Sequence, residues 1–352
     1  MSAWHYVRDY GRRRLMKIGA ASVLVGLPAT AGAVAALPKI ALEEHFSLPE
    51  FEQRGLVARP ARLNPMWADI GRRLVDLGDL RLEAMDAAGI DLSVLSLTLP
   101  GIQGEKEQAT AVRLARQAND FLAREVQKRP QRYGGFAAVP MQDPLAAADE
   151  LQRAVKELGF RGALINGQTN GLYLEDARFL PFWERVQELD VPVYLHPGNL
   201  ADSPVMFAGR PELSGPVWGW AADTGAHALR LIFSGLFKRL PRLKVILGHM
   251  GEGLPFLLWR VDNRYELMLG RALAEEERPS FFFRRNFVIT TAGVCDPHAL
   301  AASLATLGEG NVMFSVDYQE SKQAGDFIES APLGDTVRAQ VCNANAKRVL
   351  HF

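Results

Sequence analysis

The sequence predicts an α/β protein of the (β/α)8 barrel class. Eight apolar segments of strand length recur along the chain, and each is followed by a segment with helical periodicity. The strand segments are continuous apolar runs, which is typical of parallel strands covered by helices. Eight such units in about 315 residues fit a barrel with insertions, because this fold typically takes about 250 residues.

The expected strands alternate with the expected helices in chain order. The strands are Lys39–Glu43, Asp91–Leu97, Tyr133–Val139, Gly162–Asn166, Val191–His196, Leu243–Gly248, Phe287–Thr291 and Val312–Asp317. Four helices have clear signals, over residues 108–128, 145–158, 177–189 and 336–349. The first places Ala111, Leu114, Ala115, Ala118, Leu122 and Val126 on one face. Pro144 and Gly159 bracket the second, and Asp176 and Asp335 are expected to cap the last two.

A doubly wound sheet is the structural alternative, but its nucleotide-binding signature is missing. No Gly-x-Gly-x-x-Gly follows the first strand, and the glycines at 248–253 have the wrong spacing. Two long connections, residues 46–69 and 197–222, would lie over the carboxyl ends of barrel strands and wall a pocket.

The composition excludes several classes of protein. The 352 residues contain 40 basic and 40 acidic side chains and are 48% hydrophobic, so neither disorder nor binding to nucleic acid is expected. Two cysteines, Cys295 and Cys342, provide neither a disulfide framework nor a cysteine-based zinc site. The class that remains is a protein that acts on a small molecule, most simply an enzyme.

Residues 1–36 resemble an export signal. Arg12, Arg13 and Lys17 precede an uncharged Ala/Gly-rich run, Ile18–Ala36, and the arrangement is similar to a twin-arginine signal. The alternatives are a membrane anchor, or a chance basic run ahead of a wrongly assigned start. We therefore expect a signal peptide at 1–36 and a single barrel domain at 37–352. The mature protein would be periplasmic or secreted, with no stable membrane span.

Side chains that bind metals stand where four expected strands end. Glu43 and His45 are two residues apart on the first strand and so share a face, while His196, His249 and Asp317 end three others. A lone histidine after a strand is usually structural, but so many ionisable groups at one end of a barrel need a partner, and a divalent cation supplies it. The remaining histidines, His5, His227, His298 and His351, are expected to be structural or on the surface.

Four segments in fixed order resemble the amidohydrolase-superfamily decarboxylases. They are residues 39–46, 194–197, 246–255 and 314–318, and the likeness extends from Lys39 to Leu350. The branch is that of γ-resorcylate and 2,3-dihydroxybenzoate decarboxylases, with aminocarboxymuconate semialdehyde decarboxylase more distant. The resemblance implies an amidohydrolase-type barrel and non-oxidative decarboxylation of a hydroxylated aromatic, or similar unsaturated, carboxylic acid.

The same resemblance assigns roles to individual residues. One divalent ion, Zn²⁺ or Mn²⁺, would be held by Glu43, His45, His196 and Asp317. His249 would be catalytic with Glu252 orienting its ring, and Asp317 would also deliver a proton. Arg260 would lie near the substrate, although a salt-bridged helix residue is an equal alternative.

Aromatic residues complete the expected site, and alternatives stay open. Phe46, Trp218 and Trp220 are candidate stacking surfaces for the substrate, with core packing as the alternative. The same ligands would also support hydrolysis of a lactone, ester or amide, and a barrel that only binds a carboxylate is a third possibility. Gln319 stands where the family usually has proline, so the substrate is less certain than the metal. We further expect a homo-oligomer, either a dimer or a tetramer.

Overall fold

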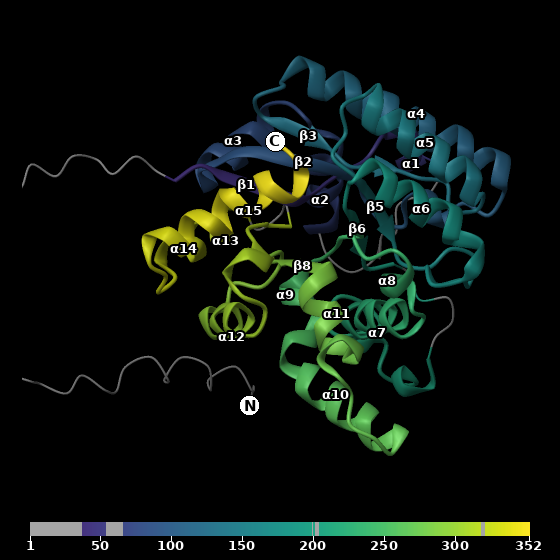
Figure 1. The fold of residues 1–352 in the computed structure, drawn as a ribbon. Helices are drawn as coiled ribbons and strands as arrows, with labels where there is room; N and C mark the ends of the chain where they lie inside the picture. The colour runs from purple at the N-terminus through teal and green to yellow at the C-terminus, as the bar shows by residue number, and fades with distance from the viewer. Residues whose placement is uncertain (1–36, 54–65, 199, 201–203, 318–320) are drawn as a thin grey trace, which may run out of the picture. The chain divides into compact units, whose positions relative to one another are not determined.

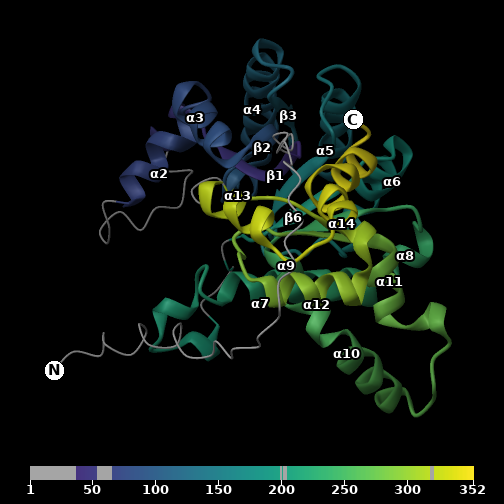
Figure 2. The ribbon, with the colours of Figure 1, turned by 90° about the vertical axis from the view of Figure 1, so that its left-hand side faces the viewer.

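The computed structural model describes residues 37–53, 66–198, 200, 204–317 and 321–352. Residues 37–352 form one compact unit. The expected export signal and the Gln319 position both lie outside the described residues. Within the described unit, parallel strands lie at the centre and helices surround them (Figures 1 and 2).

The strands follow the predicted order and are all parallel. They are β1 Lys39–Phe46, β2 Ile90–Leu97, β3 Tyr133–Gly135, β4 Ala137–Ala138, β5 Ala163–Asn166, β6 Val193–His196, β7 Val245–Leu247, β8 Phe287–Thr290 and β9 Val312–Met313. They pair as β1-β2-β3 and as β4-β5-β6-β7-β8-β9. The third predicted strand is therefore divided in two at Phe136. There the Phe136 N–H donates to the Leu95 carbonyl (2.9 Å), whereas the Ala137 N–H donates to Gly162 (2.8 Å), so the chain passes from one sheet to the other.

A side chain links the last strand to the first. No backbone ladder joins β9 to β1 among the described residues. Instead Ser315 Oγ, two residues beyond β9, accepts hydrogen bonds from the N–H groups of Leu42 (3.1 Å) and Glu43 (2.7 Å). The arrangement is consistent with the predicted (β/α)8 barrel, although its hydrogen-bonded ring of strands is not closed by backbone alone.

Two apolar cores lie on opposite sides of the strand layer, one inside the barrel and one between the strands and the helices. The inner core takes residues from every strand region, namely Ile40, Leu42, Val94, Phe136, Leu164, Tyr194, Ile246, Val288 and Met313. Helix α15, Asn345–Leu350, packs Ala346, Val349 and Leu350 against this inner core. The larger outer core lies between strands and helices, as expected when both faces of a parallel sheet are covered.

The helices largely confirm the sequence signals. They are α1 Pro49–Gln53, α2 Met66–Val75, α3 Asp79–Ala88, α4 Gln108–Lys128, α5 Pro144–Lys156, α6 Leu180–Leu189, α7 Gly219–Phe233, α8 Leu236–Arg239, α9 His249–Glu252, α10 Leu254–Leu269, α11 Pro279–Asn286, α12 Pro297–Leu307, α13 Ser321–Ser330 and α14 Asp335–Ala339. The predicted apolar face of α4 is buried.

One predicted cap is wrong. Asp335 is the first residue of α14 and Gly334 precedes it as the N-cap, with no side-chain cap hydrogen bond. The Asp335 carboxylate therefore lies in the first turn. There its negative charge interacts favourably with the helix dipole, but it does not cap an N–H group. The predicted helix 336–349 is also not uniform, because a π-helical turn at Gln340–Ala344 separates α14 from α15.

Candidate metal centre

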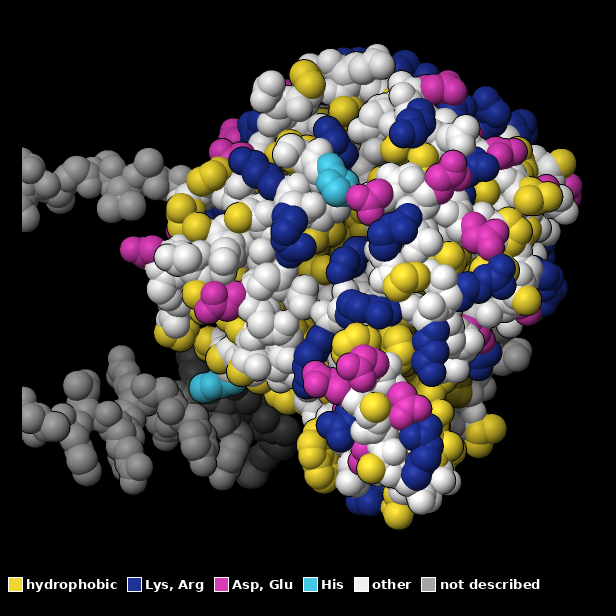
Figure 3. Space-filling model, viewed as in Figure 1, with side chains coloured by type: hydrophobic (Ala, Val, Ile, Leu, Met, Phe, Trp, Pro, Cys, Tyr) yellow, Lys and Arg dark blue, Asp and Glu magenta, His cyan; other side chains and the backbone are white. Residues whose placement is uncertain are grey.

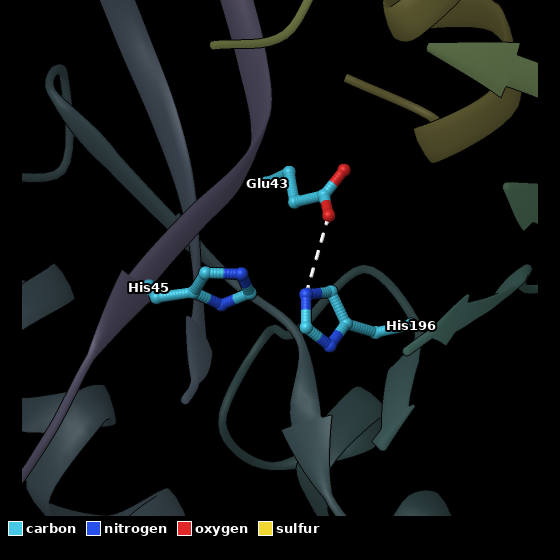
Figure 4. Close-up of side chains that lie close together, drawn as sticks. All are labelled: Glu43, His45 and His196. Atoms are coloured by element: carbon cyan, nitrogen blue, oxygen red, sulfur yellow. Dashed lines mark ion pairs between the residues drawn. The ribbon is translucent and has the colours of Figure 1, made fainter. Parts of the chain in front are cut away.

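Three predicted ligands converge on one point inside the barrel. Glu43 and His45 lie on β1, and His196 is the last residue of β6. One ligand atom from each side chain lies within 4.8 Å of the others, and all three residues are buried. Figure 4 shows the three side chains directed toward one another from strands that do not pair.

A β-bulge in β1 directs Glu43 and His45 into the barrel. Ala41 pairs with Ser93 and Glu44 pairs with Leu95, so β1 advances three residues where β2 advances two. The extra residue reverses the alternation that places Ile40 and Leu42 in the inner core. The strand can therefore fill the barrel with apolar side chains at its beginning and present ligands at its end.

Both histidines of the cluster leave one ring nitrogen available. The Nδ1 atom of His196 lies 2.8 Å from the Pro197 carbonyl, which can only accept, so Nδ1 carries a proton and Nε2 is the nitrogen left to face a cation. The Nδ1 atom of His45 lies 3.1 Å from Ser96 Oγ. Its Nε2 is buried without a hydrogen-bond partner. Burial, together with the neighbouring charge of His196, lowers the pKa of His45 to about 3 and keeps the ring neutral.

The Glu43 carboxylate has two unlike oxygens. Oε2 accepts a hydrogen bond from the Tyr194 hydroxyl, whereas Oε1 has no hydrogen-bond partner. Oε1 lies 3.3 Å from His196 Nε2 and 3.5 Å from His249 Nε2. Burial by itself would raise the pKa of Glu43, but His249 and His196 outweigh it and lower that pKa.

These observations fit a divalent cation. An unpartnered carboxylate oxygen and an unpartnered imidazole nitrogen are costly to bury, and a cation bound by both would remove that cost. Two neutral imidazoles and a carboxylate are ligands that zinc and manganese both accept. The chain therefore carries a metal-binding triad, as the sequence predicted.

The backbone of the ligand-bearing strand is fixed from its outer side. Arg81 of α3 is fully buried, and its Nη2 donates to the His45 carbonyl while Nε donates to the Asp76 carbonyl (3.3 Å). Glu44, a buried residue of β1 itself, has its pKa raised to about 8 by burial, against the opposing charge of Arg81. This polar layer holds the end of β1 without entering the barrel.

His249 begins a tight turn directly after β7. His249, Met250, Gly251, Glu252 and Gly253 all have positive φ angles, between 49° and 74°. Three of them are not glycine, and each such residue costs roughly 1 kcal/mol or more. The turn places His249 Nδ1 2.8 Å from Glu252 Oε1, the pairing that the resemblance implied.

The charge around His249 favours its protonated form in the absence of a metal. Burial opposes the charged ring, but the carboxylates of Glu43 and Glu252 outweigh burial and raise the pKa of His249 to about 10. The ring remains 23% exposed, so it borders solvent as well as the ligand cluster. A cation beside Glu43 would counter this effect.

Asp317 stands at the margin of the cluster. It adopts a φ of 62°, and its carboxylate is not among the atoms that share the 4.8 Å cluster. A Cβ atom on Gly293 would lie 4.0 Å from Asp317 Oδ2 and 3.2 Å from His249 Cδ2, so the two side chains flank this glycine. The assignment of Asp317 as fourth ligand and proton donor stays a prediction.

The predicted substrate-binding residues differ in their burial. Phe46 is 1% exposed and stacks on Phe121 of α4 (centroids 6.0 Å apart) in the outer core, in agreement with the core alternative. Trp218 is 54% exposed at the start of α7, and Trp220 is partly buried one residue into it. Arg260 is exposed on α10, and no ion pair joins it to a described residue.

Four residues of the site were not foreseen from the sequence. They are Ser96, Tyr194, Gly248 and Gly293. Gly248 has no room for a Cβ atom, because that atom would collide with the Glu43 carboxylate. Tyr194 could have been found, since it precedes His196 by two residues and shares its strand face. Nothing in the sequence marks Ser96.

His227 confirms the structural role expected of it. It is fully buried in α7, and its Nε2 accepts a hydrogen bond from the Leu174 N–H (2.8 Å). Burial lowers its pKa to about 3, below the ordinary value of 6.5. The unfolded chain therefore takes up this proton first, and stability is lost as the pH falls from about 6.5 toward 3.

Replacing His227 by Gln should flatten this pH dependence. Between pH 7 and pH 5, H227Q should lose about 2 kcal/mol less of its free energy of unfolding than the unmodified protein. Urea unfolding at the two pH values, with the same metal concentration throughout, measures the difference. Equal losses in the two proteins would show that His227 does not titrate as its burial requires.

His298 and His351 are exposed, as the sequence predicted. Neither Cys295 nor Cys342 forms a disulfide in the described chain. Among the described residues, no helix combines the length and apolar character needed to cross a membrane.

Comparison with known proteins identifies the family. The amidohydrolase family model matches residues 45–352, and the chain belongs to this family. The chain is 42% identical over 321 residues to a γ-resorcylate decarboxylase from Rhizobium sp. (strain MTP-10005), covering 88% of this chain and 97% of that one. The decarboxylase resemblance drawn from the sequence motifs is thus confirmed.

Two solved structures extend the comparison. A 2,6-dihydroxybenzoate decarboxylase in complex with 2,6-dihydroxybenzoate superposes with a TM-score of 0.84 at 41% identity, covering 90% of this chain and 99% of that one. A dihydroxybenzoic acid decarboxylase from Polaromonas sp. JS666, with bound manganese and the inhibitor 2-nitroresorcinol, has a TM-score of 0.81 at 41% identity. It covers 89% of this chain and 97% of its own.

Proposed function

We propose that this protein is a metal-dependent, non-oxidative decarboxylase of a hydroxylated aromatic carboxylic acid. The observation that carries the proposal is the buried cluster of Glu43, His45 and His196, with its unpartnered oxygen and nitrogen, beside the His249–Glu252 pair. Relatives of about 42% identity that are named as decarboxylases support it, and 2,6-dihydroxybenzoate is the first substrate to test.

The proposed ligands are Glu43, His45, His196 and Asp317. The bound cation would supply positive charge that orients the oxygens of the substrate and stabilises the negative charge that develops. In the reaction the bond between the ring carbon and the carboxylate carbon breaks, its electron pair stays on the ring, and CO2 leaves. The ring carbon then takes a proton, and we assign its delivery to Asp317, at the margin of the cluster.

His249 would act on the substrate by hydrogen bonding. Its Nδ1–H is held by Glu252, which fixes the orientation of the ring, and its Nε2 faces the same space as Glu43 Oε1. When Nε2 is protonated as well, the ring can donate from Nε2 to a substrate oxygen while negative charge builds there. Contact of Arg260, Trp218 and Phe46 with the substrate stays a prediction.

A substrate panel separates the proposed reaction from its rival. Purified protein should release CO2 from 2,6- or 2,3-dihydroxybenzoate and leave a panel of lactones, esters and amides intact. Hydrolysis of a panel member without CO2 release would assign the same site to a hydrolase.

We propose manganese as the metal, with zinc as the alternative. The manganese in the Polaromonas relative supports this choice, because the ligand set itself suits either metal. Elemental analysis of protein purified without added metal should find manganese, and zinc in its place at full occupancy would contradict the choice.

We also propose that the protein is a homo-oligomer. Apolar side chains are exposed along α10 and the connection before α7, including Phe256, Trp259, Leu267, Met268, Val205 and Met206. Figure 3 shows hydrophobic side chains over the part of the surface that α10 forms, at the bottom of the view. Such exposed apolar side chains favour burial against a second copy. Light scattering should give the mass of a dimer or tetramer, whereas a monomer would exclude the proposal.

We propose export through the twin-arginine pathway from Arg12 and Arg13 together with the uncharged Ala/Gly-rich run that follows them. Exchange of both for lysine should retain the protein in the cytoplasm of the host. If the doubly substituted protein is exported as before, the signal is of another kind.

A further inference from the structure

The two oxygens of Glu43 differ in their hydrogen bonds because of Tyr194 on β6. Tyr194 is fully buried, belongs to the inner core and lies two residues before His196. Its hydroxyl contacts Glu43 Oε2, and on its other side lies Thr290 Oγ1 of β8 at 3.0 Å. Three strands, β1, β6 and β8, thus meet in one short chain of hydrogen bonds beneath the ligand cluster.

The direction of these hydrogen bonds follows from the groups involved. An ionised carboxylate can only accept, so the Tyr194 hydroxyl donates to Glu43 Oε2. The phenol oxygen is then free to accept, and the Thr290 hydroxyl is the donor within reach. The chain of donors runs from Thr290 to Tyr194 to Glu43 and ends on the oxygen that faces away from His196.

We propose that Tyr194 is a positioning residue that makes Glu43 bind the metal through Oε1 alone. The proposal rests on the proposed metal-dependent function. Because Oε2 is occupied by the phenol, only Oε1 is left facing His196 and His249. The backbone of Gly248 also lies against the carboxylate, because a Cβ atom there would collide with Oε2. The carboxylate is therefore held in one orientation before any metal enters.

Removal of the phenol hydroxyl tests the proposal without changing the shape of the core. Tyr194→Phe should fold as the unmodified protein does, but its affinity for Mn²⁺ should fall by about 10- to 100-fold, the usual effect of losing a group that orients a metal ligand. The electron paramagnetic resonance spectrum of the Mn²⁺-loaded variant should also change, because Glu43 is free to bind through both oxygens. Competition with a metal-binding dye measures the affinity without any substrate.

A matched control separates positioning from loss of stability. Tyr133 on β3 is equally buried, and its hydroxyl donates to the Leu77 carbonyl (3.0 Å), outside the site. Tyr133→Phe should keep the Mn²⁺ affinity and spectrum of the unmodified protein. If Y133F weakens Mn²⁺ binding as much as Y194F does, or if Y194F binds Mn²⁺ as tightly as the unmodified protein, the proposal is overturned.

A second variant covers the case in which Y194F does not fold. Thr290→Val keeps the shape of the side chain and removes the donor to Tyr194. Because Thr290 acts on Glu43 only through Tyr194, Mn²⁺ affinity should fall by roughly threefold or more, a smaller loss than the one expected for Y194F. Unchanged affinity in folded T290V would then reject the proposal.

Failure of the proposed function would give a different result, because the unmodified protein would bind Mn²⁺ and yet release no CO2. An unmodified protein that binds no Mn²⁺ would overturn both.

Discussion

Replacing His249 by Asn should leave the metal in place and slow CO2 release by about 100- to 10,000-fold, the contribution typical of a positioned acid–base group. His249 lies 3.5 Å from Glu43 Oε1 but is paired with Glu252 through its other nitrogen, and it is not part of the buried ligand cluster. Its loss should therefore remove a donor to the substrate rather than a ligand. Steady-state rates and elemental analysis on the same preparation give both quantities.

The exposed His298 provides a matched control for this variant. His298→Asn should keep the full rate and the full metal content, since its side chain lies on the surface at the start of α12. Loss of the metal from H249N would make His249 a ligand. A rate close to that of the unmodified protein would remove it from the reaction.

The second large effect is expected at His196. His196→Ala should reduce the metal content to far below one ion per chain and abolish CO2 release, while circular dichroism stays unchanged. The reason is that His196 provides the only ligand of the cluster from β6, and its Nδ1–H bond to Pro197 leaves Nε2 free for the cation. Thermal unfolding with and without Mn²⁺ should show stabilisation by the metal only in the unmodified protein.

Retention of full metal by H196A would refute the ligand assignment. Asp317→Asn, measured alongside, tests the fourth ligand, which lies outside the described cluster. If Asp317 both binds the metal and delivers the proton, metal content and rate should fall together. A D317N protein with unchanged metal content and unchanged rate would exclude Asp317 from both roles.

The sequence predicted the site because ligands of this fold follow strand ends. Glu43 and His45 share a face of β1 by simple alternation and His196 ends β6, which was enough to group them. Their direction into the barrel depends on the bulge before Glu44. Phe46, one residue past His45, falls on the opposite face by the same rule, and the structure places it in the outer core. That position agrees with core packing, the alternative that the sequence left open for Phe46.

Other features depend on contacts between residues far apart in the sequence. The bulge between Ala41 and Glu44 arises from a register shift between β1 and β2. Ser315, 272 residues after Glu43, links the end of β9 to β1 by a hydrogen bond. The left-handed turn at 249–253 contains three residues that do not favour it, so local preference argues against the conformation observed. Tertiary packing determines these conformations, and the spacing of residues in the sequence does not predict it.

The central claim, that a metal held in this cluster is needed for decarboxylation, is tested most directly by removing and restoring the metal. Protein stripped by a chelator should release no CO2 from 2,6-dihydroxybenzoate, and one equivalent of Mn²⁺ per chain should restore the original rate. Undiminished CO2 release from protein shown by elemental analysis to be metal-free would contradict the claim.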